Sequence, residues 1–133
     1  MTKERNSFSA SLQVTSKRLR ASEIARILHV DGATVQEAGE PQTARRGSRV
    51  LQHAVWRMQS PLAEHEPIEK HLDIIASLLD RKRDEFNSLA DKCELEVWCF
   101  LSLRESQYGF SLNHEMMSRL TQAGVDVIFD VYS

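Results

Sequence analysis

The chain has 133 residues, a length typical of a single domain, and its hydrophobic (41%) and charged (27%) contents are those of an ordinary globular protein. No apolar run approaches the ~18–20 residues that span a bilayer, and no apolar segment with a cleavage site follows Met1–Arg5, so we expect neither a membrane helix nor a signal peptide. Two cysteines, Cys93 and Cys99, do not make a disulfide framework, which favours a reducing, cytoplasmic location.

The net charge of −2 is too small to indicate nucleic-acid binding, but the charges are unevenly distributed. Residues 1–60 hold 10 Lys and Arg against 5 Asp and Glu, whereas residues 61–133 hold 7 against 14. Two interpretations remain open. The two halves face each other in the fold, or one of them contacts a charged partner.

The first half of the chain contains two predicted strands and one helix. Ser7–Val14 alternates apolar and polar residues, the pattern of a strand with one solvated face. Apolar residues at helical spacing predict a helix over Ser22–His29, with Ser22 as its N-cap. Asp31–Arg49 is polar and glycine-containing and predicts a flexible loop, after which Val50–Met58 reads as a second strand.

The second half begins with an amphipathic helix. It starts near Pro61 or Pro67, and its apolar stripe runs from Ile68 to Leu89. The charged run Asp80–Glu85 either bends this helix or divides it in two.

The last three elements are a strand, a helix and a strand. Leu95–Leu103 is the most hydrophobic strand, and its alternation puts Trp98 and Phe100 on the face opposite the aliphatic residues. A helix over Asn113–Gln122 follows, and Val125–Tyr132 closes the chain as a strand.

The order is therefore βαβ, a helical connection, and βαβ again. It predicts an α+β fold, a two-layer sandwich in which the helices pack on one face of a four-stranded sheet. We expect residues 1–133 to form one domain with a flexible loop at about 31–49. The predicted core comprises Trp56, Leu72, Ile75, Leu79, Val97, Leu101, Phe129 and Val131.

No catalytic or metal-binding motif is present in the sequence. His65 and His71 are six residues apart, about 240° around a helix, and neither cysteine has a nearby histidine to activate it. We therefore predict no catalytic residue, metal site or cofactor.

Two groups of residues are candidates for binding. Arg45, Arg46 and Arg49 surround a glycine and could hold an anion, although a basic loop is also an ordinary solvated surface. Trp98, Phe100 and Tyr132 share the sheet face that the helices are expected to leave open, where an exposed apolar patch marks an interface. The alternative is that the long loop folds across this face and buries it.

Several short runs along the chain resemble those of one bacterial family. They are Ile24-Ala25-Arg26-Ile27-Leu28, Arg46-Gly47 ahead of Trp56, the helix Ile68–Leu79, Gly109-Phe110-Ser111-Leu112, and Leu120, Gly124 and Asp130-Val131-Tyr132. In these runs the chain resembles the family catalogued as domain of unknown function 4279, over nearly its whole length. Members of that family often have a proline soon after the first helix, where this chain reads Val30-Asp31-Gly32-Ala33-Thr34. The resemblance implies a single bacterial domain and carries no activity.

These observations predict a non-enzymatic protein-interaction module, immunity-like or regulatory by analogy. Its expected partner is another protein or a second copy of the chain, and neither nucleic acid nor a membrane is expected. The alternative is a small-ligand or anion-binding regulatory domain.

Overall fold

The computed structural model describes residues 5–39, 52–105 and 107–133, and it places them in one five-stranded sheet and four helices. The strands are β1 (Ser7–Ser16), β2 (Thr34–Gln36), β3 (Ala54–Gln59), β4 (Glu94–Ser102) and β5 (Asp126–Tyr132). The helices are α1 (Ala21–Leu28), α2 (Ile68–Arg81), α3 (Arg83–Leu89) and α4 (His114–Ala123). None of these helices is long and apolar enough to cross a membrane.

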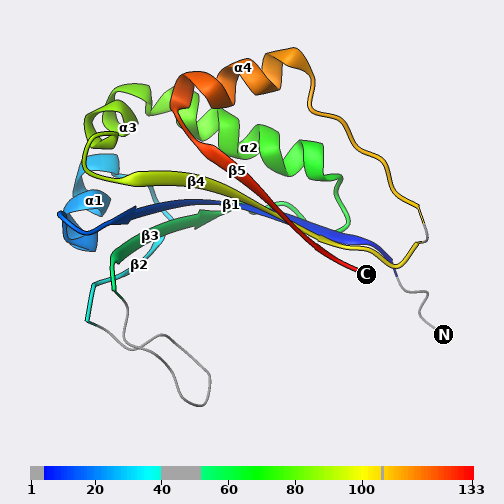
Figure 1. Cartoon of the computed structure of the whole chain (residues 1–133), viewed down its shortest axis with the longest axis horizontal. Coiled ribbons are helices and arrows are strands. Elements are labelled where there is room, and N and C mark those ends of the chain that lie inside the picture. The colour runs from blue at the N-terminus through cyan, green and yellow to red at the C-terminus, as the bar shows by residue number, and fades with distance from the viewer. Residues whose placement is uncertain (1–4, 40–51, 106) are drawn as a thin grey trace.

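The sheet has the order β2-β3-β1-β4-β5 and is mixed. The central strand β1 is antiparallel to both β3 and β4, and β2 is antiparallel to β3, whereas β4 and β5 are parallel. All four helices lie on one side of the sheet (Figure 1). The α+β fold with helices on one face is thus as predicted.

The predicted number of four strands is wrong, because β2 lies inside the segment 31–49 that was expected to be a loop. This three-residue strand stands between Gly32 and Gly39, which both have positive φ angles (85° and 91°). It is too short to show an alternating pattern, and its place is decided by pairing, with Val35 opposite Trp56 of β3. Residues 40–51 lie outside the part of the chain that the structure describes.

The additional strand also changes the connection of the first half. β3 pairs antiparallel with both β1 and β2, so the first predicted βαβ unit, from β1 through α1 to β3, does not join two parallel strands. The second unit, β4-α4-β5, does join two parallel strands through a helix.

The core lies between the sheet and the helices. Apolar residues of β1 alternate toward it, and α2 packs across β1 and β4 while α1 lies over β3. Burial of the expected core residues from β3, α2 and β4 is confirmed: these are Trp56, Leu72, Ile75, Leu79, Val97 and Leu101. Phe129 and Val131 were wrongly assigned to the core, since 38% and 53% of their surfaces are exposed. The reason is that α4 lies against α2 and α3.

The start of α1 differs from its prediction as well. Its N-cap is Arg20 and not Ser22, and the carboxylate of Glu37 accepts hydrogen bonds from the backbone N–H groups of Ala21 and Ser22. These hydrogen bonds, that from Ala21 above all, lower the pKa of Glu37. A side chain just beyond β2 therefore satisfies the helix terminus that a local serine was expected to cap.

The other helix boundaries agree more closely with the sequence. The charged run divides the long helix in two at Lys82, which has φ −111° and ψ 30°. The Asn113 side chain caps α4 by accepting from the Met116 N–H at 2.9 Å, and Gly124 ends it in the left-handed region with φ 69°. Glycine suits this position because it adopts positive φ without steric cost.

Candidate functional site

The sheet face opposite the helices carries the three aromatic residues singled out in the sequence. Trp98 and Phe100 of β4 alternate with buried Val97, Cys99 and Leu101, so they point away from the core. Tyr132 of β5 pairs with Ser102 on the same face. The predicted placement of the aromatic residues on the helix-free face therefore holds.

Trp98 and Phe100 form an ordered pair. Their ring centroids are 6.1 Å apart with an interplanar angle of 16°, and the Trp98 indole Nε1 donates to Glu96 Oε1 at 3.3 Å. The Arg57 guanidinium of β3 lies 5.9 Å from the Phe100 centroid, within cation–π range. It also donates to Ser11 Oγ through Nε (3.3 Å) and Nη2 (3.2 Å), which fixes its direction.

Arg57 was not among the residues predicted for this site. The signal was present in the strand pattern, because Arg57 lies between Trp56 and Met58, which point to the core side. What the sequence could not give was the sheet order, which puts β3 and β4 on either side of β1 and so brings Arg57 close to Phe100.

Tyr132 stands at the margin of the same face. It is 56% exposed, and its hydroxyl donates to Asp130 Oδ2 at 2.8 Å. Phe100 and Tyr132 line a hollow of about 240 Å³ whose remaining walls are mostly polar: Ser7, Phe8, Ser9, Gln59, Leu62, Glu64 and Ser102. The face therefore combines aromatic rings with hydroxyl, amide and carboxylate groups.

The predicted arginines Arg45, Arg46 and Arg49 lie outside the described residues.

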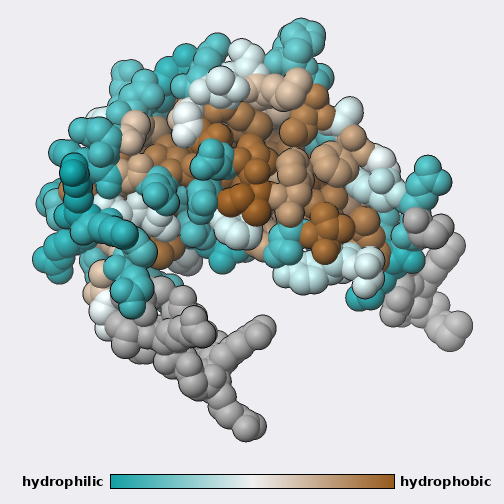
Figure 2. Space-filling model, in the orientation of Figure 1, coloured by the Kyte–Doolittle hydropathy of each residue, from teal (hydrophilic) through white to brown (hydrophobic). Residues whose placement is uncertain are grey.

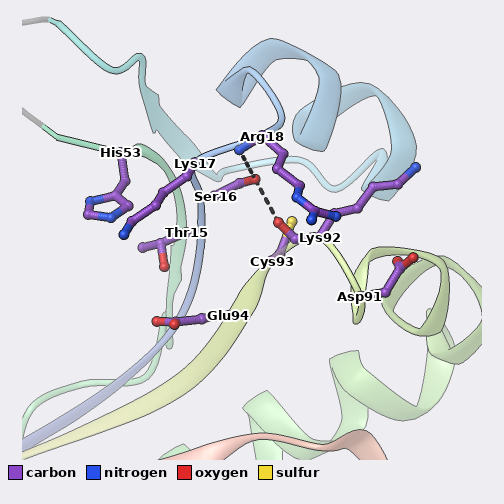
Figure 3. Close-up of a pocket in the computed structure, with 9 residues that line it drawn as sticks. All are labelled: Thr15, Ser16, Lys17, Arg18, His53, Asp91, Lys92, Cys93 and Glu94. Atoms are coloured by element: carbon purple, nitrogen blue, oxygen red, sulfur yellow. Dashed lines mark hydrogen bonds between the residues drawn. The ribbon is translucent and has the colours of Figure 1, made fainter.

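A second hollow, of about 310 Å³, opens where β1 ends and β4 begins (Figure 3). Ser16 Oγ donates to the Lys92 carbonyl at 2.8 Å and accepts from the backbone N–H groups of Arg18 and Leu19. Figure 3 shows the Cys93 sulfur beside this junction. Burial raises the pKa of the Cys93 thiol, which opposes formation of a nucleophilic thiolate. The Ser16 hydroxyl makes its hydrogen bonds with backbone groups, and burial keeps the Cys93 thiol protonated. Neither side chain is therefore an activated nucleophile in this hollow.

The third hollow, of about 410 Å³, lies between α2, the end of β3 and the segment after α1. Val30, Met58, Ile74 and Leu78 give it an apolar lining, and its charged lining residues include Asp31, Arg81 and Lys82. Its volume is within the range of small-molecule sites.

One Ser–His contact was missed by the sequence analysis. Ser60 Oγ lies 2.8 Å from His71 Nδ1, and both side chains are buried. Burial lowers the pKa of His71 against the opposing effects of the Ala63 and Glu66 carbonyls, so the ring is neutral at pH 7. No signal in the sequence joins two residues eleven positions apart. At 1% exposure His71 cannot meet a substrate, and the pair links the end of β3 to α2.

Metal ligands are not grouped in the described residues. No set of three or more His, Cys, Asp and Glu side chains there could hold an ion. Cys99 is buried under the helices, and that burial raises its pKa to about 12.

Comparison with known proteins adds a family to this geometry. Neither a curated protein nor a solved structure matches the chain. A family model does match, over residues 6–133, and this range contains the entire sheet and all four helices of the described structure. The chain therefore belongs to the family described as domain of unknown function (DUF4279).

Proposed function

We propose that this chain is a non-enzymatic module that binds a protein partner through its helix-free sheet face. The observation that carries the proposal is the ordered Trp98–Phe100 pair, with Arg57 above Phe100, on a face that no helix of the described chain covers. Aromatic and arginine side chains are the residues most enriched at the energetic centres of interfaces. Tyr132 extends the same surface toward the sheet edge.

The proposed setting is a reducing compartment, the bacterial cytoplasm. Its support is that Cys93 and Cys99 are both free thiols. Arg45, Arg46 and Arg49 remain candidates for additional contacts to an acidic partner, since arginine forks suit carboxylates. A regulatory or immunity-like role is compatible with a module of this kind.

The decisive variant is Trp98→Glu, which puts a charge at the centre of the proposed surface. Its matched control is Gln36→Glu, which adds the same charge to the same face at the opposite edge of the sheet, on β2. The purified wild-type chain and both variants are used to capture proteins from lysate of the source cells. Direct binding of any captured protein is then measured with purified components by titration calorimetry.

We expect the wild type and Gln36→Glu to bind the same partner, and Trp98→Glu to weaken that binding by ~2 kcal/mol or more. Circular dichroism must show that Trp98→Glu remains folded. A folded Trp98→Glu that binds the partner with unchanged affinity would place the interface elsewhere.

A small ligand is the second candidate, and the 410 Å³ hollow beside α2 favours it. An apolar lining that also includes Arg81 and Lys82 fits a compound with an apolar body and an anionic group. Thermal-shift measurements with short-chain carboxylates test this, with Ile74→Phe as the variant that fills the hollow. Stabilisation of the wild type that disappears in Ile74→Phe supports the ligand site, and equal responses of the two argue against it.

A further inference from the structure

The strand β5 is an edge strand with a hydrophobic side that the helices do not cover. In the described part of the chain β4 is the one strand that pairs with β5, so the outer edge of β5 around Phe129 is open to pairing with another strand. On the helix side, Phe129 and Val131 are 38% and 53% exposed. Long, exposed apolar edge strands are ordinarily avoided in soluble proteins, because they pair with other chains.

Hydrophobic surface continues from β5 to the segment before α4 and to α4 itself (Figure 2). The Phe110 ring lies 5.3 Å from the Phe129 ring, centroid to centroid, and Phe110 and Met117 are 39% and 50% exposed. A strand added beside β5 would therefore meet an apolar surface on the helix side as well as a free backbone edge.

The charges on β5 restrict which strand can be added and in what register. Its sequence is Asp-Val-Ile-Phe-Asp-Val-Tyr, with Asp126 and Asp130 on the helix-free face and Phe129 on the other. In an antiparallel pair related by a two-fold axis, full overlap of two β5 strands puts Phe129 opposite Phe129. Val127 then lies opposite Val131, and Asp126 lies opposite Tyr132.

Neighbouring registers are disfavoured by electrostatics. A shift of two residues puts Asp126 directly opposite Asp130 in one direction, and Asp130 opposite Asp130 in the other. Directly opposite side chains are about 5 Å apart, and like charges there destabilise a pair, whereas the full-overlap register leaves the carboxylates diagonal at about 7–8 Å. A shift of one residue would turn the apolar side to the wrong face.

We propose that β5 pairs antiparallel with β5 of a second copy of this chain, centred on Phe129. The seven paired positions bury Phe129 and Val131 together, and Phe110 and Met117 extend the contact toward α4. The two sheets become one continuous sheet, with the helices of both copies on the same side. This inference does not depend on the proposed function, because Trp98 and Phe100 lie inside the sheet on β4.

The oligomeric state of the wild-type chain is the first test. Sedimentation and light scattering over about a hundredfold range of concentration should show a monomer–dimer equilibrium. Phe129→Glu puts two like charges at the two-fold axis and should raise the dimer dissociation constant at least tenfold, about 1.4 kcal/mol. Ile27→Glu on α1 is the matched control. Ile27 is 37% exposed, and α1 lies over β3, which is separated from β5 in the sheet by β1 and β4. It should dimerise as the wild type does.

Disulfide trapping tests the register. Cys99 lies opposite Phe129 on the neighbouring strand, so the background carries Cys99→Val and Cys93→Ser. In that background Phe129→Cys should cross-link into a dimer under mild oxidation, because its two copies face each other within disulfide reach. Position 131 is more exposed, but in the proposed register it lies opposite Val127 of the second copy. The two copies of Val131→Cys are then four residues apart, about 13 Å along the strand, and should not cross-link.

Three outcomes would overturn the proposal. They are a wild-type monomer at every concentration, a folded Phe129→Glu that dimerises like the wild type, and cross-linking of Val131→Cys in place of Phe129→Cys. The first of these is decided on the unaltered chain, so a variant that fails to fold does not remove the test.

Discussion

Several single residues in this chain make hydrogen bonds between elements that are distant in sequence. Ser60 and His71 join β3 to α2, and Glu37 holds the first turn of α1 from sixteen residues away. Ser60 Oγ, His71 Nδ1 and the Glu37 carboxylate have hydrogen-bond partners inside the fold, and such pairing matters because an unpaired polar group removed from water costs about 1–3 kcal/mol. The buried histidine has a measurable consequence.

His71 should make the chain less stable as the pH falls. Burial lowers its pKa in the folded state, while the unfolded chain titrates near the ordinary value of about 6.5. The unfolded state therefore binds more protons below about pH 6.5, and stability is lost as the pH falls from there toward the folded-state pKa. One such group changes the free energy of unfolding by at most about 1.4 kcal/mol per pH unit.

Urea unfolding between about pH 5 and 7.5 measures this dependence. His71→Gln keeps a hydrogen-bonding group beside Ser60 and does not titrate, so it should show a smaller loss on acidification than the wild type. His114→Gln, at the exposed start of α4, is the control and should keep the wild-type dependence. Equal slopes for the wild type and His71→Gln would mean that other groups dominate.

At the scale of elements, α4 is held by polar contacts more than by burial. Leu120 is its only fully buried residue, and Met117 is half exposed. Arg119 connects α4 to α2, donating to Asp73 Oδ1 and Asp80 Oδ2 at 2.9 Å each and to Ser77 Oγ at 3.3 Å. Three acceptors on successive turns of one helix fix the direction of this guanidinium.

Arg119→Ala should lower the free energy of unfolding by about 1 kcal/mol, since each partly exposed ion pair contributes little alone but the three contacts share one side chain. Urea unfolding at low and high salt provides the measurement, and the loss should shrink in high salt because the charges are screened. Gln122→Ala, an exposed position on the same helix, should change stability by less than about 0.5 kcal/mol. A loss in Arg119→Ala no greater than that of the control would show that the apolar contacts of α4, and not Arg119, hold it in place.

For the molecule as a whole, the four helices and the sheet of the described chain enclose one continuous core, and two surfaces that we propose for recognition lie outside it. One is the helix-free face with Trp98 and Phe100, and the other is the β5 edge with Phe129 and Val131. The first follows from having helices on one side only, and the second from α4 lying against other helices instead of over β5. The two surfaces meet at Tyr132. Its side chain lies on the helix-free face, and its backbone is part of the edge strand β5.

The sequence by itself determined the strands, the helices and their inward faces wherever apolar residues recur with a regular period. β4 and α2 carry long, uninterrupted patterns, so the burial of Val97, Leu101, Leu72 and Ile75 and the outward direction of Trp98 and Phe100 could be predicted from spacing alone. The helix predicted over Asn113–Gln122 agrees with α4 to within one residue at each end, because Asn113 and Gly124 act on the helix ends within one helical turn.

Tertiary structure alone decided what depends on contacts between distant segments. The strand β2 exists through its pairing with β3, and the Arg57–Phe100 and Ser60–His71 contacts depend on which elements lie side by side. Phe129 and Val131 have the alternation of core residues, but alternation fixes only the side of the sheet to which a residue points. Whether a helix covers that side is determined by how the helices pack on one another, and here that packing leaves β5 uncovered.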